Sequence, residues 1–167
     1  MKKTPYLFYF NKSYVYMDIE EVIKSSRPIE DQYHRTYLNI VYSGIWLEQS
    51  TIDPLKQRGL SHPQYNVLRI VKGYKAPMTV ASIQQRMLYQ TSNVTRIIDK
   101  LVDKGLLSKE SSDTDRRVVL VNITSVGLEK LKELHELIYG SVKRIVGKNL
   151  SVDETMLLGN LLDKMRS

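Results

Sequence analysis

The chain has 167 residues, enough for one well-buried core, and its 42% hydrophobic and 26% charged residues are typical of an ordinary globular protein. Its apolar runs fall far short of the roughly 20 residues that a membrane helix needs, and the lack of cysteine excludes disulfides, thiolate zinc sites and cysteine redox sensing. Most of the formal net charge of +7 falls in residues 63–121, where ten basic and five acidic residues permit a nucleic-acid partner without establishing one.

The first sixteen residues differ from the rest, because they hold six of the thirteen Tyr and Phe residues in no helical period. Met17 then opens an acidic stretch that resembles an ordinary N-terminus. We favour the hypothesis that translation starts at Met17 and that residues 1–16 are an upstream extension. The alternative is a native arm that packs its aromatic side chains on the body or on a partner. Because the chain carries no secretory signal, we expect a cytoplasmic protein.

Residues 17–60 are predicted to contain one long helix. Apolar residues recur at three- and four-residue spacing from Ile29 to about Gln49, which indicates a helix with a single apolar stripe. Pro54 should kink or end its C-terminal extension, and Gly59 then supplies a left-handed cap position.

Residues 61–124 predict three helices and a hairpin. Ser61 and Gln64 form a capping-box pattern that opens a helix, which Gly73 and Pro77 should close. Thr79 is a plausible N-cap for a short second helix.

A third, amphipathic helix follows a tight turn and ends at Gly105. Residues 106–110 and 117–123 then pair as two strands of a hairpin across a polar loop.

Two more helices are predicted in residues 125–167, the first capped by Thr124 and the second opened by Ser151 and Glu154. The prediction is therefore six helices and one hairpin. The N-terminal helix and this leucine-rich C-terminal pair carry more apolar surface than the small central region can cover. Packing within the chain and an isologous homodimer both remain open at this point.

The third helix of the central region has the polarity of a helix that reads DNA. Val94, Ile98 and Leu101 fall in one sector of a helical wheel together with Ile97, while Asn93, Arg96 and Lys100 form a line on the other side. Amide, hydroxyl and guanidinium groups bind base edges and phosphates, and such helices contact DNA with their N-terminal residues. We therefore predict that Gln90 to Arg96 is the main reading surface.

The hairpin adds a second predicted contact. Arg116 and Arg117 follow the loop directly, and a long cation at a hairpin tip can enter the narrow, electronegative minor groove. Asp115 can accept the Arg117 guanidinium and hold it in one rotamer. The residues that we assign to DNA binding are Thr79, Gln90, Thr91, Ser92, Asn93, Thr95, Arg96, Lys100, Asp115, Arg116 and Arg117.

An enzyme is disfavoured, because the sequence shows no Gly-rich phosphate loop, no paired carboxylates in an apolar setting and no Ser/His/Asp pattern. The stronger rival is a winged helix used for protein contact, which should expose apolar side chains where Asn93, Arg96 and Lys100 stand. We expect no cofactor and no metal site, since His34, His62 and His135 are widely spaced.

Several motifs together resemble the MarR family of bacterial transcriptional regulators. They are Ser61-His62-Pro63-Gln64-Tyr65, Thr79-Val80, Ser92-Asn93-Val94-Thr95-Arg96, Leu101-Val102-Asp103-Lys104-Gly105-Leu106-Leu107, Asp115-Arg116-Arg117 and Val119-Leu120-Val121-Asn122-Ile123-Thr124. The resemblance implies a mainly helical fold with a small β-hairpin wing, that is, a winged helix-turn-helix with dimerising N- and C-terminal helices.

The resemblance also implies a homodimer that binds a near-palindromic operator in double-stranded DNA, usually as a repressor. The arginine that matches Arg117 enters the minor groove in such proteins, and many members release DNA when a small organic anion binds. Tyr33, Tyr37 and Trp46 are candidates for such an effector pocket, although aromatic residues at helical spacing more often belong to a core or a dimer contact. Leu88 and Gln90 depart from the family pattern, which has a small residue and a serine at these positions.

Overall fold

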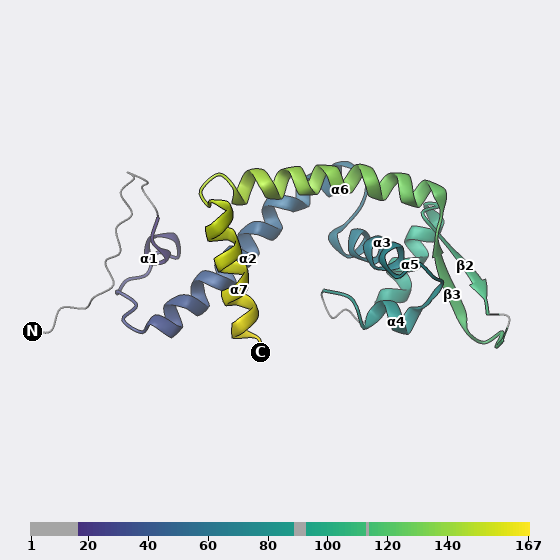
Figure 1. Ribbon diagram of the computed structural model, residues 1–167, viewed down its shortest axis with the longest axis horizontal. Coiled ribbons are helices and arrows are strands. Elements are labelled where there is room, and N and C mark those ends of the chain that lie inside the picture. The colour runs from purple at the N-terminus through teal and green to yellow at the C-terminus, as the bar shows by residue number, and fades with distance from the viewer. Residues whose placement is uncertain (1–16, 89–92, 113) are drawn as a thin grey trace, which may run out of the picture. The chain divides into compact units, whose positions relative to one another are not determined.

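The computed structural model describes residues 17–88, 93–112 and 114–167 (Figure 1). They form two compact units, one ending at Leu47 and one from Glu48 to Ser167. The described residues make up seven helices and three short strands. The predicted fold class, mainly helical with a small β wing, is confirmed, with a third strand added to the hairpin. The hypothesis about residues 1–16 lies outside the described residues.

The first unit holds a short helix that the sequence did not predict, α1 (Ile19–Val22). Arg35 binds it through ion pairs to Asp18, at 3.0 Å, and to Glu20. The Glu20 carboxylate also accepts the Ile29 backbone N–H at 3.4 Å. Polar contacts therefore hold the four-residue helix, which is too short to be stable alone.

The long helix α2 (Gln32–Gln57) starts three residues later and ends eight residues later than predicted. It runs through Pro54 instead of ending there. Gly59 (φ +74°) closes it as predicted, with the Leu60 N–H donating to the Leu55 carbonyl at 3.0 Å. Leu55 and Leu60 are both buried, so the end of α2 is anchored in the core of the second unit.

Helix α3 (His62–Tyr74) opens with the predicted capping box, in which Ser61 and Gln64 exchange side-chain and backbone hydrogen bonds. Its end differs from the prediction. Gly73 lies within the helix, and Lys75 takes the left-handed cap conformation with φ +59°. Helices α4 (Val80–Gln84) and α5 (Val94–Asp103) follow.

The sheet has the order β1-β3-β2 and is antiparallel throughout. Strands β2 (Leu107–Ser111) and β3 (Val119–Ile123) form the predicted hairpin, and β1 (Met78–Thr79) pairs with the other edge of β3. In this register Val121 stands between Met78 and Lys109. The start of α4 is therefore tied to the wing by strand pairing.

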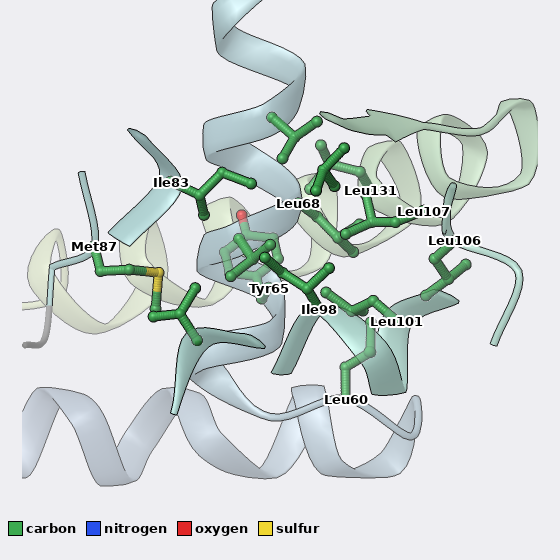
Figure 2. Close-up of a cluster of buried hydrophobic side chains, with 14 of the residues drawn as sticks. Leu60, Tyr65, Leu68, Ile83, Met87, Ile98, Leu101, Leu106, Leu107 and Leu131 are labelled. Carbon is green, nitrogen blue, oxygen red and sulfur yellow. The ribbon is translucent and has the colours of Figure 1, made fainter. Parts of the chain in front are cut away.

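One hydrophobic core joins these elements, and Figure 2 shows much of it. Leu68 of α3, Ile83 of α4 and Ile98 of α5 are each fully buried within it. Leu107 of β2 and Leu131 of α6 close the same cluster from the wing and from the next helix. Helix α3 thus supplies the platform on which the helix-turn-helix and the wing rest.

Helix α6 (Ser125–Val146) leads away from this core to α7 (Val152–Met165). The predicted caps are confirmed: the Thr124 hydroxyl accepts the Gly127 N–H at 3.0 Å, and Ser151 forms a capping box with Glu154. No residue of α7 is buried within the chain.

Candidate nucleic-acid interface

Helix α5 buries the face that its sequence predicts to be apolar. Val94, Ile98 and Leu101 are at most 2% exposed. Asn93, Thr95, Arg96 and Lys100 lie at the surface, and their residue types are those that bind bases and phosphates. The structure therefore gives α5 one anchored face and one polar face. Gln90, Thr91 and Ser92, which were predicted to belong to the DNA-reading surface, lie outside the described residues.

A buried amide holds the turn that leads towards α5. Asn66 of α3 is 6% exposed, and its Oδ1 accepts the backbone N–H of Leu88 at 3.2 Å. This hydrogen bond fixes the backbone of Leu88, whereas the Leu88 side chain faces solvent and the residue is 73% exposed. Sequence reasoning missed Asn66; the available signal was an isolated polar residue inside the apolar run from Tyr65 to Leu68.

The other end of α5 is closed as predicted by Gly105, with φ +68°. The Leu106 N–H donates to the Leu101 carbonyl at 2.9 Å, and the Gly105 N–H donates to the Val102 carbonyl at 2.8 Å. Lys104 Nζ also donates to the carbonyl of Gly59 at the end of α2. The C-terminal end of α5 is thus tied to its neighbours by backbone and side-chain bonds.

Asp99 on α5 forms an ion pair with Lys109 on β2. The contact joins the helix to the wing. The positive charge of Lys109 also offsets the negative charge of Asp99. The repulsion between Asp99 and a DNA phosphate is therefore weaker than the sequence alone suggests.

The wing loop places Asp115 differently from the prediction. Its Oδ1 accepts the backbone N–H of Arg117 at 2.9 Å, and the ion pairs of the described residues do not include one to the Arg117 guanidinium. An aspartate commonly bonds the backbone two residues on, and this turn takes precedence over the side-chain pair. Asp115 therefore shapes the loop, and the side chains of Arg116 and Arg117 project from it into solvent.

Thr79 has a structural role at the start of α4. It is half-buried, and its Oγ1 accepts the Ser82 N–H at 3.1 Å as the predicted N-cap. The Ser82 hydroxyl lies 3.1 Å from the same oxygen. Its predicted contact with DNA stays a prediction.

The remaining candidates belong to the first unit. Tyr33, Tyr37 and Trp46 stand on α2 and are 88%, 60% and 46% exposed. His34 stacks on Tyr37 with ring centroids 6.5 Å apart. Among the residues that the structure describes, no three His, Asp or Glu side chains gather in a way that could hold a metal ion. No helix within the described ranges is long and apolar enough to cross a membrane.

Three comparisons bear on this arrangement. The model of the MarR family matches residues 60–119, which run from the end of α2 into β3. The HTH-type transcriptional regulator YkoM of Bacillus subtilis is 30% identical over 118 residues, which are 71% of this chain and 75% of YkoM.

Two solved structures share the fold. A cysteine-to-serine mutant of MarR from Escherichia coli, complexed with operator DNA, superposes with a TM-score of 0.69 at 24% identity, covering 81% of this chain and 99% of that chain. The organohalide-sensing regulator RdhR, bound to 2,4-dichlorophenol, superposes with a TM-score of 0.72 at 18% identity. The superposition covers 85% of this chain and 86% of that chain. With a helix-turn-helix, a basic wing and these relatives, the chain belongs to the MarR family and is a DNA-binding transcriptional regulator, not an enzyme.

Proposed function

We propose that this protein represses transcription by binding a near-palindromic operator as a homodimer, and that a small organic anion releases it. The observation that carries the proposal is the exposed polar line of Asn93, Arg96 and Lys100 on α5, next to a wing that presents Arg116 and Arg117. A winged helix used for protein contact should show apolar side chains on that line. The polar face therefore favours DNA.

The proposed roles follow the chemistry of each side chain. Asn93 and Arg96 can form paired hydrogen bonds with adenine and guanine in the major groove, while Lys100 binds phosphate. Arg117 enters the minor groove. Hydroxyl and amide contacts to the sugar–phosphate backbone of the DNA come from Thr79, Thr95 and the segment Gln90–Ser92. Operator binding by the similar E. coli MarR supports this assignment.

The proposed dimer uses the helices on either side of residues 61–124, namely residues 17–60 and 125–167. In α7, six apolar side chains are about half exposed or more: Val152 76%, Met156 61%, Leu157 58%, Leu158 47%, Leu161 55% and Met165 56%. A helix with this much apolar surface and no buried residue needs a partner in water. Two copies would also supply two recognition helices for two half-sites.

The proposed effector is an aromatic or phenolic anion that binds near Tyr33, Tyr37 and Trp46. Exposed aromatic rings on one helix offer stacking surface for such a ligand. RdhR, which shares the fold, is bound to 2,4-dichlorophenol. We further propose that the protein acts in the cytoplasm, as expected for a regulator that binds DNA.

The test begins by selecting the fragments of the source genome that the purified protein binds. Binding to the DNA upstream of the protein's own gene is measured in addition. We expect a sequence-specific complex whose affinity falls steeply as salt rises. Arg117→Ala should weaken it at least tenfold, about 1.4 kcal/mol, the scale of a lost charge-assisted contact. Asn93→Ala should relax the preference at one base position in each half-site.

The matched control is Lys132→Ala, which removes a positive charge from the exposed side of α6. It should leave affinity within twofold, because Lys132 is not among the proposed DNA contacts. Equal losses for Arg117→Ala and Lys132→Ala would mean that net charge alone drives binding, and would reject the wing contact.

A further inference from the structure

We propose that Arg86, at the end of the first helix of the helix-turn-helix, is an additional phosphate-binding residue, and that Tyr74 positions it. The inference rests on the proposed DNA binding and adds a contact outside α5 and the wing. Its basis is an exposed arginine that is stacked on a tyrosine ring and bonded to a backbone carbonyl, in a long stretch of sequence without an acidic residue.

The geometry holds the guanidinium in one place. Its central carbon lies 5.1 Å from the centre of the Tyr74 ring, and Nη1 donates to the Ser82 carbonyl at 2.9 Å. Stacking on a ring does not use the N–H groups in the guanidinium plane, and Nε and Nη2, which the bond to Ser82 does not involve, form a parallel pair of donors that matches a phosphate. Because the side chain is already ordered, binding costs less of its rotamer entropy.

The local charge leaves Arg86 available. Between Asp53 and Asp99 the sequence has seven basic residues and no acidic one. Accordingly, none of the ion pairs of the described residues includes Arg86. An exposed arginine with no carboxylate to satisfy it is suited to an anionic partner.

The position indicates phosphate instead of a base. In a helix-turn-helix the second helix enters the major groove, while the first crosses the sugar–phosphate backbone. Arg86 lies two residues beyond the end of that first helix, and its side chain bonds back to the Ser82 carbonyl within the helix. In Figure 1, α4 and the tip of the wing lie along the lower edge of the second unit, and α6 lies along its upper edge. Phosphate contacts from α4 and groove contacts from the wing would then meet the same duplex.

The competing explanation is that Arg86 has only a structural role, in which its contact with Tyr74 holds the end of α4 against the end of α3. The two roles differ in salt dependence, because each phosphate contact that is lost lowers the slope of log affinity against log salt by about 0.9. The experiment therefore measures binding of Arg86→Gln to a mixed-sequence duplex and to the selected fragment over a range of salt. Thermal unfolding is recorded in parallel.

We expect Arg86→Gln to lose roughly tenfold in affinity at low salt, to the same extent on both duplexes, with a slope lower by about one per bound protomer. Tyr74→Leu should lose roughly two- to fivefold, as expected for one cation–π contact, whereas Tyr74→Phe keeps the ring and the affinity. In an Arg86→Gln background the effect of Tyr74→Leu on binding should vanish, since Tyr74 acts through Arg86.

Arg69→Gln is the matched control, because Arg69 also stacks on a tyrosine, 5.8 Å from the centre of the Tyr65 ring. It removes the same charge and the same type of contact from α3 and should leave the slope unchanged. An unchanged slope in Arg86→Gln would reject the phosphate contact, and a lower melting temperature in the same variant would show that Arg86 has only a structural role. Equal slopes for both variants would likewise overturn the assignment. Wild-type protein that binds neither duplex would instead reject the proposed function, and the Arg86 role with it.

Discussion

Gly127 lies where the first turn of α6 closely approaches the Leu106 backbone and Ile123. A Cβ atom at this position would lie 2.1 Å from the Leu106 carbonyl oxygen and 2.9 Å from Ile123 Cγ1. A backbone oxygen cannot rotate away as a side chain can. The first turn of α6 therefore sits against the junction of α5 and the sheet only because this residue has no side chain.

Gly127→Ala should lower the free energy of unfolding by about 1–3 kcal/mol, the usual cost of forcing an extra group into a packed site. Chemical denaturation followed by circular dichroism measures it. Gly140→Ala in the same helix is the control, because a Cβ there meets nothing within 4 Å. In that variant the free energy of unfolding should rise by about 0.4–1 kcal/mol, because alanine makes the unfolded chain less flexible than glycine does. Equal effects at both positions would contradict the steric explanation.

Asn66 provides a second test at the scale of one residue. Asn66→Leu leaves the Leu88 N–H without its acceptor, which should cost about 1–3 kcal/mol of stability. DNA affinity should fall as well, because the turn before α5 loses its anchor. The comparison is Asn122→Ala, which removes an exposed amide bonded to Glu110 at 2.5 Å and should cost much less. A smaller loss for Asn66→Leu than for Asn122→Ala would show that the buried bond does not hold the turn.

Among the elements, local capping chemistry was predictable from the sequence. Thr79, Thr124 and the two capping boxes each depend on residues three positions apart, so the pattern carries the whole interaction. Strand β1 was not predictable, since its two residues become a strand only by pairing with β3, Met78 with Val121.

Other differences have the same origin in contacts distant along the chain. Helix α2 continues past Pro54 because Leu55, and Leu60 beyond its end, are buried in the core, and this burial offsets the hydrogen bond that proline removes. The sequence identified the polar face of α5 through its period. It did not identify Asn66 or Arg86, because their partners, Leu88 and Tyr74, are 22 and 12 positions away.

The acidic residue that opens α7 links this element to pH. Hydrogen bonds from the Ser151 hydroxyl and backbone N–H hold the pKa of Glu154 below the ordinary glutamate value. A carboxyl whose pKa is lowered by folding stabilises the fold fully above its ordinary pKa and loses that contribution as pH falls through the lowered value.

Glu154→Gln keeps an amide that can complete the capping box but removes the titrating group. The variant should therefore be less stable than wild type at neutral pH, and the difference should shrink in the acid range below the ordinary glutamate pKa. Melting temperatures over a pH series measure this. In a Ser151→Ala background the same substitution should have a smaller effect. A difference that stays constant over the whole pH series would contradict the linkage.

At the scale of the whole molecule, we expect the unburied apolar side chains of α7 to determine the state of association. Leu157→Glu combined with Leu161→Glu should convert a dimer into a monomer, because two charges would be buried without partners in the interface. Sedimentation equilibrium measures the mass directly. Asn160→Glu places one charge on the same helix without removing apolar surface and should leave the dimer intact. Wild-type protein that sediments as a monomer at micromolar concentration would reject the proposed dimer.

The pairing of β1 with β3 also has a consequence for the spacing of the DNA site. The ladder between Met78–Thr79 and Leu120–Val121 fixes how far the start of α4 lies from the wing. The proposed phosphate contact of Arg86 and the proposed minor-groove contact of Arg117 would then lie at a fixed distance from each other. One base pair inserted between them shifts one contact by about 3.4 Å along the duplex axis. A site lengthened inside a half-site should lose the wing contact outright, whereas a protein with a loosely hinged wing would tolerate the insertion.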